Sequence, residues 1–352
     1  MKFKAFGRRT GLRVSQLALG TGNFGTGWGY GAERAEARAM FDRYAEAGGN
    51  FIDTADNYQG GQSEQMVGEF IAAQRDHFVL ATKYTLGVSG QGTPGTTGNS
   101  RRAMVQSVEA SLKRLDTDRI DLLWAHFPDG ETPVEEIMRG FDDLVRAGKI
   151  VYGGLSNFPA WRVARADAIA ELRGWAPLAG IQTEYSLAER SADREAIPMI
   201  EALGLGGALW SPLGGGVLTG KYRNNEAGRL QGLGGVLLRS EKSERDTAVV
   251  DTVIAIAGET GATPTQVAIA WLLHRDAASA TALVPILGPR TVAQLEGTLG
   301  ALELALSSEQ MERLNTVSAF APNAAQQTTL ETVGQITGGA PERVAAPKVP
   351  VA

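Results

Sequence analysis

Cysteine is absent from this 352-residue chain. Its absence excludes disulfide bonds, thiolate nucleophiles and thiolate metal sites, and it is typical of a reducing compartment. No stretch reaches the roughly 18 uninterrupted apolar residues of a membrane-spanning helix, and the basic start MKFKAFGRRTGLRVS lacks the apolar segment of a secretion signal. We therefore expect a soluble cytoplasmic protein without a membrane partner.

An excess of positive charge is also missing. The net charge is -5, and acidic and basic residues are interspersed along the chain. Binding to nucleic acid requires a basic face or stripe, so a nucleic-acid partner is not expected. With 43% apolar residues the chain can bury a large core, and its length permits one large domain or two ordinary ones. The oligomeric state cannot be derived from these features.

Short apolar runs alternate with amphipathic segments of helical period after an N-terminal hairpin expected around the turn GRRTG. The runs that predict strands lie at 17–20, 51–55, 78–84, 120–127, 150–157, 179–185, 207–213 and 281–287. The segments that predict helices lie at 32–48, 63–74, 100–116, 133–148, 159–173, 193–203, 246–276 in two pieces, and 291–302, with one more from 307. Eight strand–helix pairs predict a parallel (β/α)8 barrel, the TIM-barrel fold of the α/β class.

Three segments fall outside the repeat. A Gly-rich loop at 87–99 follows the third strand, and a long loop at 214–245 follows the seventh. Loops after the strands of such a barrel lie on its active face. The Ala/Pro/Thr-rich end of the chain predicts a tail without regular structure. We expect one barrel domain at 1–319 and a tail at 320–352 that is loop or partly disordered.

A Gly-rich motif near the N-terminus has two interpretations. Residues 20–25, GTGNFG, match the dinucleotide-binding pattern G-x-G-x-x-G. In the Rossmann fold a helix opens at the third glycine, whereas here TGWGYG intervenes. We expect these glycines to let backbone approach a flat ligand, and we do not expect a Rossmann domain.

Polar residues follow nearly every predicted strand. Asp53 and Tyr58 come after the second strand, Lys83 ends the third and His126 follows the fourth. The carboxyl ends of parallel barrel strands meet on one face, so these side chains are expected to converge. The other strand ends contribute Ser156, Asn157, Gln182, Glu184, Trp210, Ser211 and Arg290. Each residue alone has an ordinary structural role, such as a turn cap or a core histidine, but the combination predicts a chemical site.

The first four residues form a set that can transfer a proton. An isolated tyrosine has a pKa of about 10 and is a weak acid at neutral pH. A cation about 4 Å away at an effective dielectric near 20 is worth on the order of 4 kcal/mol, so Lys83 would make Tyr58 a stronger acid. Asp53 would keep Lys83 charged, and His126 would bind and orient the substrate oxygen.

These residues stand in motifs that resemble those of the aldo-keto reductases, an NADPH-dependent family with a (β/α)8 barrel. The resemblance runs from about residue 10 to 302 and rests on GTGNFG, FIDTADNYQGGQSE, LATKY, IDLLWAHFPD, GKIVYGGLSNF, IQTEYSL, LWSPLGGGVLTGKY and VPILGPRTVAQLEGTLGAL. It implies reversible reduction of an aldehyde or ketone to the alcohol. It also implies that Asp53, Tyr58, Lys83 and His126 are the catalytic residues, with Tyr58 the proton donor.

The resemblance further implies an NADP(H) site. Ser156, Asn157 and Gln182 would contact the nicotinamide carboxamide, and Trp210 would stack on the nicotinamide ring. The other positions implied to contact the cofactor are Gly20, Thr21, Gly22, Asp53, Ser211, Pro212, Leu213, Gly215, Leu218, Lys221, Leu287, Gly288, Arg290, Gln294 and Thr298. The planar fork of Arg290 suits a 2′-phosphate, so NADP is favoured over NAD. Gly297 and Thr298 depart from the acidic residue and asparagine usual there, which puts the adenine contacts in doubt.

Substrate identity stays open. Phe24, Trp28, Tyr84 and Phe127 are candidate walls of the substrate pocket, and simple packing within the barrel is the alternative role for each. Two other functions remain to be weighed. One is a nicotinamide-binding regulatory or sensor subunit with slow turnover. The other is a metal-dependent isomerase, which would need more carboxylate and imidazole groups than Asp53, His126 and Glu184, so no metal is expected.

Overall fold

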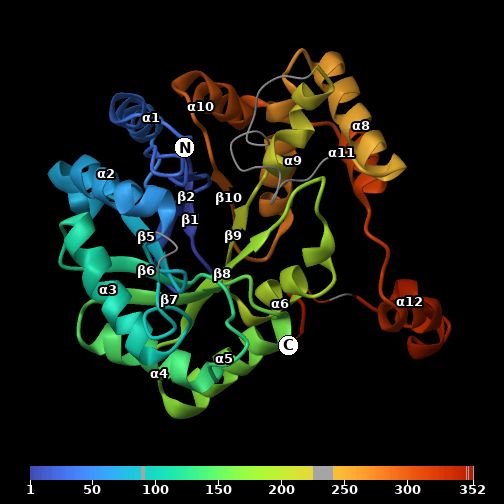
Figure 1. Cartoon of the computed structure of the whole chain (residues 1–352). Helices are drawn as coiled ribbons and strands as arrows, with labels where there is room; N and C mark the ends of the chain where they lie inside the picture. Colours follow the sequence, from blue (N-terminus) through green and yellow to red (C-terminus); the bar gives the residue numbers. More distant parts are fainter. Residues whose placement is uncertain (89–91, 225–240, 346, 348, 352) are drawn as a thin grey trace.

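The protein is described by a computed structural model that covers residues 1–88, 92–224, 241–345, 347 and 349–351. Eight parallel strands close into a barrel in the order β10-β3-β4-β5-β6-β7-β8-β9, surrounded by helices (Figure 1). The barrel strands are β3 (Ala18–Gly20), β4 (Phe51–Asp53), β5 (Val79–Tyr84), β6 (Ile120–Ala125), β7 (Ile150–Ser156), β8 (Leu178–Glu184), β9 (Gly206–Trp210) and β10 (Leu283–Leu287). The predicted (β/α)8 barrel is confirmed.

The helices follow the strands as the sequence pattern predicts, and α8 and α9 are the α-helices among the described residues between β9 and β10. They are α1 (Arg34–Glu46), α2 (Gln62–Ile71), α3 (Arg101–Leu115), α4 (Val134–Arg146), α5 (Ala160–Arg173), α6 (Ala196–Leu203), α8 (Glu244–Thr260), α9 (Pro264–Ala278), α10 (Val292–Leu299), α11 (Ser308–Ser318) and α12 (Ala324–Ile336). The segment 20–33 runs from β3 to α1 as a loop with short bridges, so no helix opens at its third glycine.

The predicted N-terminal hairpin pairs β1 (Phe3–Ala5) with β2 (Arg13–Ser15) and closes one end of the barrel. Phe6 is fully buried and meets Phe51 and Trp124 edge-on, with ring centroids 5.6 and 6.3 Å apart. A Cβ on Gly180 or Gly206 would lie 2.7 Å from the Phe6 ring, so the ring requires glycine at both positions. Because Phe6 packs among these strands, the opposite, carboxyl-terminal face is left for a site.

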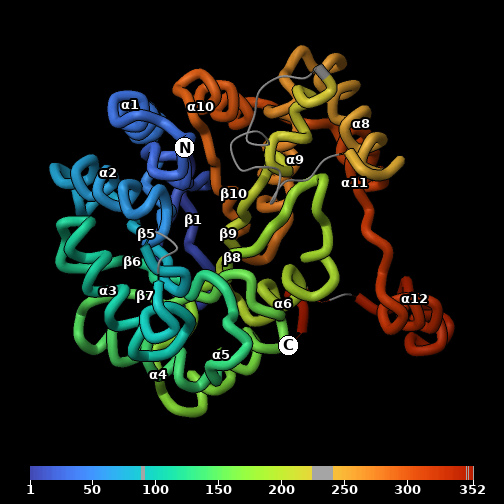
Figure 2. Tube along the Cα trace, viewed as in Figure 1, coloured from blue at the N-terminus to red at the C-terminus, as the bar shows by residue number. Residues whose placement is uncertain are grey.

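The chain end after α11 extends away from the barrel. Helix α12 stands apart from the ring of helices and has no buried residue (Figures 1 and 2). Its N-terminus is held by Arg194, whose guanidinium lies 4.0 Å from the Phe320 ring and whose carbonyl accepts from Gln326 at 2.6 Å. A tail that is loop or partly disordered was predicted for 320–352. The helix differs from that prediction, because Asn323 and Gln326 form a capping box that starts it.

Parts of three predicted segments lie outside the described residues, namely 89–91 in the loop 87–99, 225–240 in the loop 214–245, and 346, 348 and 352 in the tail. Within the part of the chain that is described, no helix combines the length and apolarity needed to cross a membrane.

Candidate active site

The four residues predicted from three neighbouring strand ends meet at the carboxyl-terminal face of the barrel. Asp53 is the last residue of β4 and Lys83 lies near the end of β5, one strand further around the barrel. Tyr58 opens the short 3₁₀ turn η1 (Tyr58–Gly61), and His126 directly follows β6. The register of neighbouring parallel strands therefore brings together side chains that are up to about 70 positions apart in the sequence.

Lys83 is the centre of this group. Its Nζ donates to Asp53 Oδ2 at 2.5 Å, to the carbonyl of Thr54 at 2.8 Å and to the Tyr58 hydroxyl at 3.1 Å. An ammonium has three protons, so these three acceptors satisfy it. The ammonium is thus fixed next to the phenol.

The charges around Lys83 favour its ammonium form. The side chain is fully buried, and burial alone lowers the pKa of a lysine. The Asp53 carboxylate and the Tyr58 hydroxyl outweigh that effect, and the pKa of Lys83 is raised above its usual value. Lys83 therefore remains a cation, and Asp53 is the acceptor that makes its burial tolerable.

Asp53 has a second partner in Gln182 of β8. Gln182 Nε2 donates to Asp53 Oδ1 at 2.8 Å, and both side chains are buried. Both oxygens of the carboxylate are therefore held, one by Lys83 and one by Gln182. The amide oxygen of Gln182 and its second amide proton remain for another partner.

His126 presents a neutral imidazole beside Tyr58. The two ring centroids are 6.0 Å apart in an edge-on arrangement, and Phe127 stacks on the imidazole at 4.6 Å. Burial, and then the Lys83 charge, lower the pKa of His126 well below its usual value. Its Nδ1 is buried and has no partner among the described residues, so Nε2 is the nitrogen available to a ligand.

The residues predicted to hold nicotinamide adjoin this group. Trp210 ends β9, is partly buried, and donates from Nε1 to Asn157 Oδ1 at 3.0 Å. Asn157 is half-buried, whereas Ser156 is fully buried. Of these side chains, Asn157 and Trp210 reach the surface of the site.

The turn after β9 has a tight, left-handed backbone. The segment η5 (Gly214–Thr219) contains Gly215 and Gly216 with positive φ values of 69° and 98°. Ser211 also has a positive φ, and its Oγ accepts from the Gly215 backbone at 3.1 Å. Positive φ at successive positions turns the backbone sharply. The Lys221 and Tyr222 side chains lie against this turn, and the Tyr222 hydroxyl donates to the Gly215 carbonyl at 2.8 Å.

Arg290 supplies a cation in the segment between β10 and α10. Its guanidinium has no ion pair or hydrogen bond with the described residues, while its backbone N–H donates to Gln294 Oε1 at 2.9 Å. Gly288, two residues earlier, is exposed, and a Cβ there would meet nothing closer than 4.0 Å. An uncommitted guanidinium beside open backbone fits a phosphate group.

Several positions implied to contact the cofactor are buried in the protein. A Cβ on Gly20 would lie 2.7 Å from Ile286, and the Thr21 hydroxyl is bonded to Asp53 and Ser63 within the protein. The remaining members that are buried are Pro212, Leu218, Leu287 and Thr298. Four other positions are only partly buried, and their side chains or backbone can contact a cofactor: Gly22, Leu213, Gly215 and Lys221.

The four candidate pocket walls divide into two pairs. Trp28 and Phe127 are 36% and 39% exposed, and they flank Tyr58 and His126. Phe24 and Tyr84 are fully buried in the core. For Phe24 and Tyr84 the alternative role, packing in the core, therefore replaces the pocket role: Phe24 packs on Phe70 of α2, and the Tyr84 hydroxyl donates to the Asn99 carbonyl at 3.4 Å.

Asp56 received no role in the sequence analysis although it stands in the same motif as Asp53. Its side chain is 1% exposed, its Oδ2 accepts from Ser107 at 2.9 Å, and its backbone N–H donates to the Lys83 carbonyl at 3.1 Å. Burial, followed by the nearby Glu64 charge, raises the pKa of Asp56 to about 7. The signal that could have found it is a second acidic residue between Asp53 and Tyr58 in the same motif.

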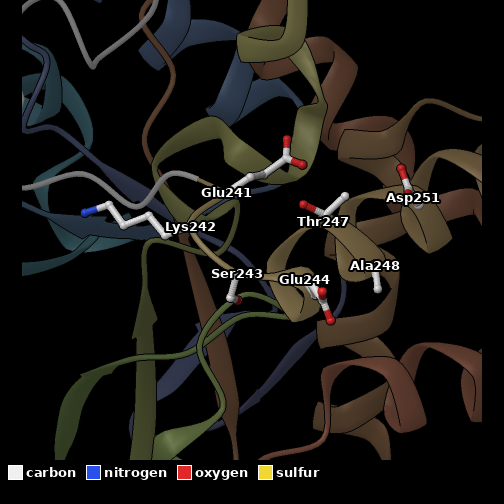
Figure 3. Close-up of a pocket in the computed structure, with 7 residues that line it drawn as sticks. All are labelled: Glu241, Lys242, Ser243, Glu244, Thr247, Ala248 and Asp251. Carbon is white, nitrogen blue, oxygen red and sulfur yellow. The ribbon is translucent and has the colours of Figure 1, made fainter.

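A depression at the start of α8 is separate from this site (Figure 3). Its lining residues are Glu241, Lys242, Ser243, Glu244, Thr247, Ala248 and Asp251. Arg223 binds Glu241 and Asp251, each at 2.6 Å, so these two carboxylates have a structural partner. None of the strand-end residues lies in this depression. Across the described residues, no group of three or more His, Asp or Glu side chains is arranged to hold a metal ion.

Comparison with known proteins agrees with this geometry. The sequence model of the Aldo/keto reductase family matches residues 16–319, and the chain belongs to that family. It is 37% identical to norsolorinic acid reductase of Aspergillus flavus over 88% of this chain and 79% of that protein. It is 38% identical to the NADP(+) aryl-alcohol dehydrogenase of Phanerodontia chrysosporium over 88% and 84%. An uncharacterized oxidoreductase of Bacillus subtilis is 37% identical over 88% and 94%.

Membership of this family, together with oxidoreductases as relatives, supports an oxidoreductase that acts on small carbonyl compounds. Nicotinamide cofactors, mostly NADPH, are general in the family.

Proposed function

We propose that this protein is an NADPH-dependent reductase of aldehydes or ketones, with Tyr58 as the proton donor. The observation that carries the proposal is the 3.1 Å hydrogen bond from the buried Lys83 ammonium to the Tyr58 hydroxyl. A cation at this distance stabilises the phenolate that remains after Tyr58 has given up its proton.

The proton transfer uses two further groups, Asp53 and His126. Asp53 holds Lys83 at 2.5 Å, so the ammonium stays charged and in place while the phenolate forms. The neutral His126 donates a hydrogen bond from Nε2 to the carbonyl oxygen and fixes its position beside the Tyr58 hydroxyl. The substrate oxygen therefore receives its proton from Tyr58 and its orientation from His126.

NADPH, when bound, supplies the hydride for the carbonyl carbon. Trp210 and Asn157 would hold its nicotinamide, the backbone of η5 and Ser211 its pyrophosphate, and Arg290 the 2′-phosphate. The guanidinium of Arg290, which has no ion pair or hydrogen bond with the described residues, and the tight glycine turn at Gly215 and Gly216 beside the Lys221 side chain support this assignment. A planar guanidinium binds phosphate oxygens in pairs, which favours NADPH over NADH.

The substrate we propose is an aryl aldehyde or aryl ketone. Trp28 lies edge-on to Tyr58 at 5.9 Å, and Phe127 stacks on His126 at 4.6 Å, so two partly exposed rings border the two groups that bind the carbonyl oxygen. Aromatic side chains contribute about 0.5–1.5 kcal/mol per ring contact beyond area burial. The relatives named for an aryl alcohol and for norsolorinic acid support this substrate class.

The direct test is NADPH oxidation by the purified protein with a panel of aryl and aliphatic aldehydes and ketones. We expect multiple turnovers with aryl carbonyls and product alcohol in a 1:1 ratio to NADP⁺. Binding of NADPH without multiple turnovers on any carbonyl would contradict the reductase and favour the sensor subunit.

A further inference from the structure

Asn157 links the ends of four consecutive barrel strands. It directly follows β7, and its Nδ2 donates at 3.0 Å to the carbonyl of His126, the residue after β6. Its Oδ1 accepts from Trp210 Nε1 at the end of β9, also at 3.0 Å, and its backbone N–H donates to the carbonyl of Gln182 in β8 at 2.9 Å. One residue thus contacts a group of the proposed proton site and a group of the proposed nicotinamide site.

The chemistry of the partners fixes which way the Asn157 amide points. An indole N–H can only donate and a backbone carbonyl can only accept, so Oδ1 must face Trp210 and Nδ2 must face His126. The backbone of Asn157 has a φ of +62°, a left-handed conformation that asparagine and glycine adopt most readily. The conformation and the two side-chain bonds together hold the amide in one orientation.

No amide proton of Asn157 is left for a ligand. Nδ2 carries two protons; one goes to the His126 carbonyl and the other to Ser156 Oγ at 3.0 Å. Only one lone pair on Oδ1 remains. Asn157 can therefore accept from a bound carboxamide but cannot donate to it.

We infer that Asn157 is a positioning residue that couples the Trp210 indole N–H to the backbone of His126. Trp210 then supports carbonyl reduction through this N–H as well as through its flat ring. The inference rests on the proposed reductase function and deepens it. The backbone of His126 is held from both sides, because its own N–H donates to the Tyr84 carbonyl at 3.0 Å and its carbonyl accepts from Asn157. Loss of the coupling releases one side and loosens the imidazole that orients the substrate.

A double-mutant cycle tests the coupling in the catalytic step. Trp210→Phe keeps a flat ring without the N–H, and Asn157→Gly keeps the left-handed backbone without the amide. We expect each single variant to lower the single-turnover rate of carbonyl reduction about tenfold. The double variant should be within twofold of Asn157→Gly, and NADPH affinity should change less than threefold in Trp210→Phe. Losses that multiply in the double variant would overturn the coupling.

A matched substitution separates the N–H from the ring. Site-specific incorporation of 3-benzothienylalanine at position 210 keeps the bicyclic face and replaces the N–H with sulfur. We expect it to reproduce most of the rate loss of Trp210→Phe. A rate equal to that of the wild type would show that Trp210 acts by stacking alone and would overturn the inference.

A readout without cofactor separates this inference from the proposed function. In protein with ¹⁵N-labelled tryptophan, the Trp210 indole resonance is assigned by its absence from Trp210→Phe. We expect it to shift upfield and to exchange with D2O at least tenfold faster in Asn157→Gly, with no change in Ser156→Ala. An unmoved resonance in an active protein overturns the coupling alone. A moved resonance in a protein that reduces no carbonyl supports the coupling and overturns the reductase.

Discussion

Lys83 donates its ammonium proton to the Tyr58 hydroxyl across 3.1 Å, inside a barrel where the lysine side chain is fully buried. The two residues come from different segments of the chain, one from β5 and one from the turn after β4. Removal of either side chain should therefore change the rate of the proposed carbonyl reduction while the barrel fold is kept. Substitutions of this pair are the first test of the proposal.

Tyr58→Phe removes the proposed proton donor and leaves the ring. We expect NADPH binding within twofold of the wild type and a loss of about 10²–10⁴-fold in the steady-state rate of carbonyl reduction, the usual range for a general acid. Fluorescence titration and NADPH oxidation measure the two quantities. A variant that still reduces carbonyls at the rate of the wild type would remove Tyr58 from the mechanism.

Lys83→Met leaves Asp53 buried without its cation. Loss of one partner of a buried ion pair costs about 3–5 kcal/mol of unfolding free energy, so urea unfolding should show a decrease of that size. The double variant Lys83→Met/Asp53→Asn should recover part of it, because no unpaired charge remains. The pH profile of carbonyl reduction should change in Lys83→Met, and an unaltered profile would contradict the role of Lys83 in activating Tyr58.

Asp56 should make stability depend on pH near neutrality. Its pKa is raised in the folded protein to about 7 from an ordinary value of 3.8, so the folded state binds the proton more tightly than the unfolded state. The folded protein is then penalised as pH rises from about 4, and the penalty is complete above about pH 7, at most about 4 kcal/mol. Below about pH 4 it is absent.

Asp56→Asn removes that titration and is isosteric. Urea unfolding at pH 5 and pH 8 should show a smaller loss of stability on going to pH 8 in the variant than in the wild type. The Arg114–Glu64 pair beside Asp56, at 2.6 Å, is unchanged in both proteins. Parallel pH dependences for the two proteins would show that Asp56 does not titrate in this window.

Arg290→Ala should separate the two nicotinamide cofactors. Loss of charge-assisted hydrogen bonds to the 2′-phosphate predicts a rise of about tenfold or more in the KM for NADPH and less than twofold in that for NADH. Arg290→Lys, which keeps the charge but not the planar fork, should lie between. Equal effects on both cofactors would place Arg290 away from the 2′-phosphate.

Trp28→Ala and Phe127→Ala test the substrate class. Each should raise the KM for an aryl aldehyde about fivefold, as expected for a ring contact of about 1 kcal/mol, and leave a short aliphatic aldehyde within twofold. Trp28→Phe serves as the control that retains an aromatic face. The aryl proposal fails if both aldehydes are affected to the same extent.

The sequence by itself determined the fold class and grouped the four residues of the proposed proton site. Alternation of short apolar runs with helical periods is a local property, and eight repeats of it leave few arrangements other than a closed parallel barrel. Because the carboxyl ends of parallel strands share one face, Asp53, Tyr58, Lys83 and His126 could be grouped before any coordinates. The helix α12 was missed, since its start depends on one capping pair, Asn323 and Gln326, within a composition typical of loops.

Only the tertiary structure decided which side chains face the site and what they bind there. Phe24 and Tyr84 lie at strand ends or in the loops after them, as Trp28 and Phe127 do, yet the first two are fully buried and the other two are more than a third exposed. The amide of Asn157 is committed to Trp210 and His126, neither of which is adjacent to it in the sequence. The direction of a side chain and its hydrogen-bond partners depend on packing between segments that are distant in the sequence. Periodicity along the chain does not encode that packing, although the packing decides what each of these residues can do chemically.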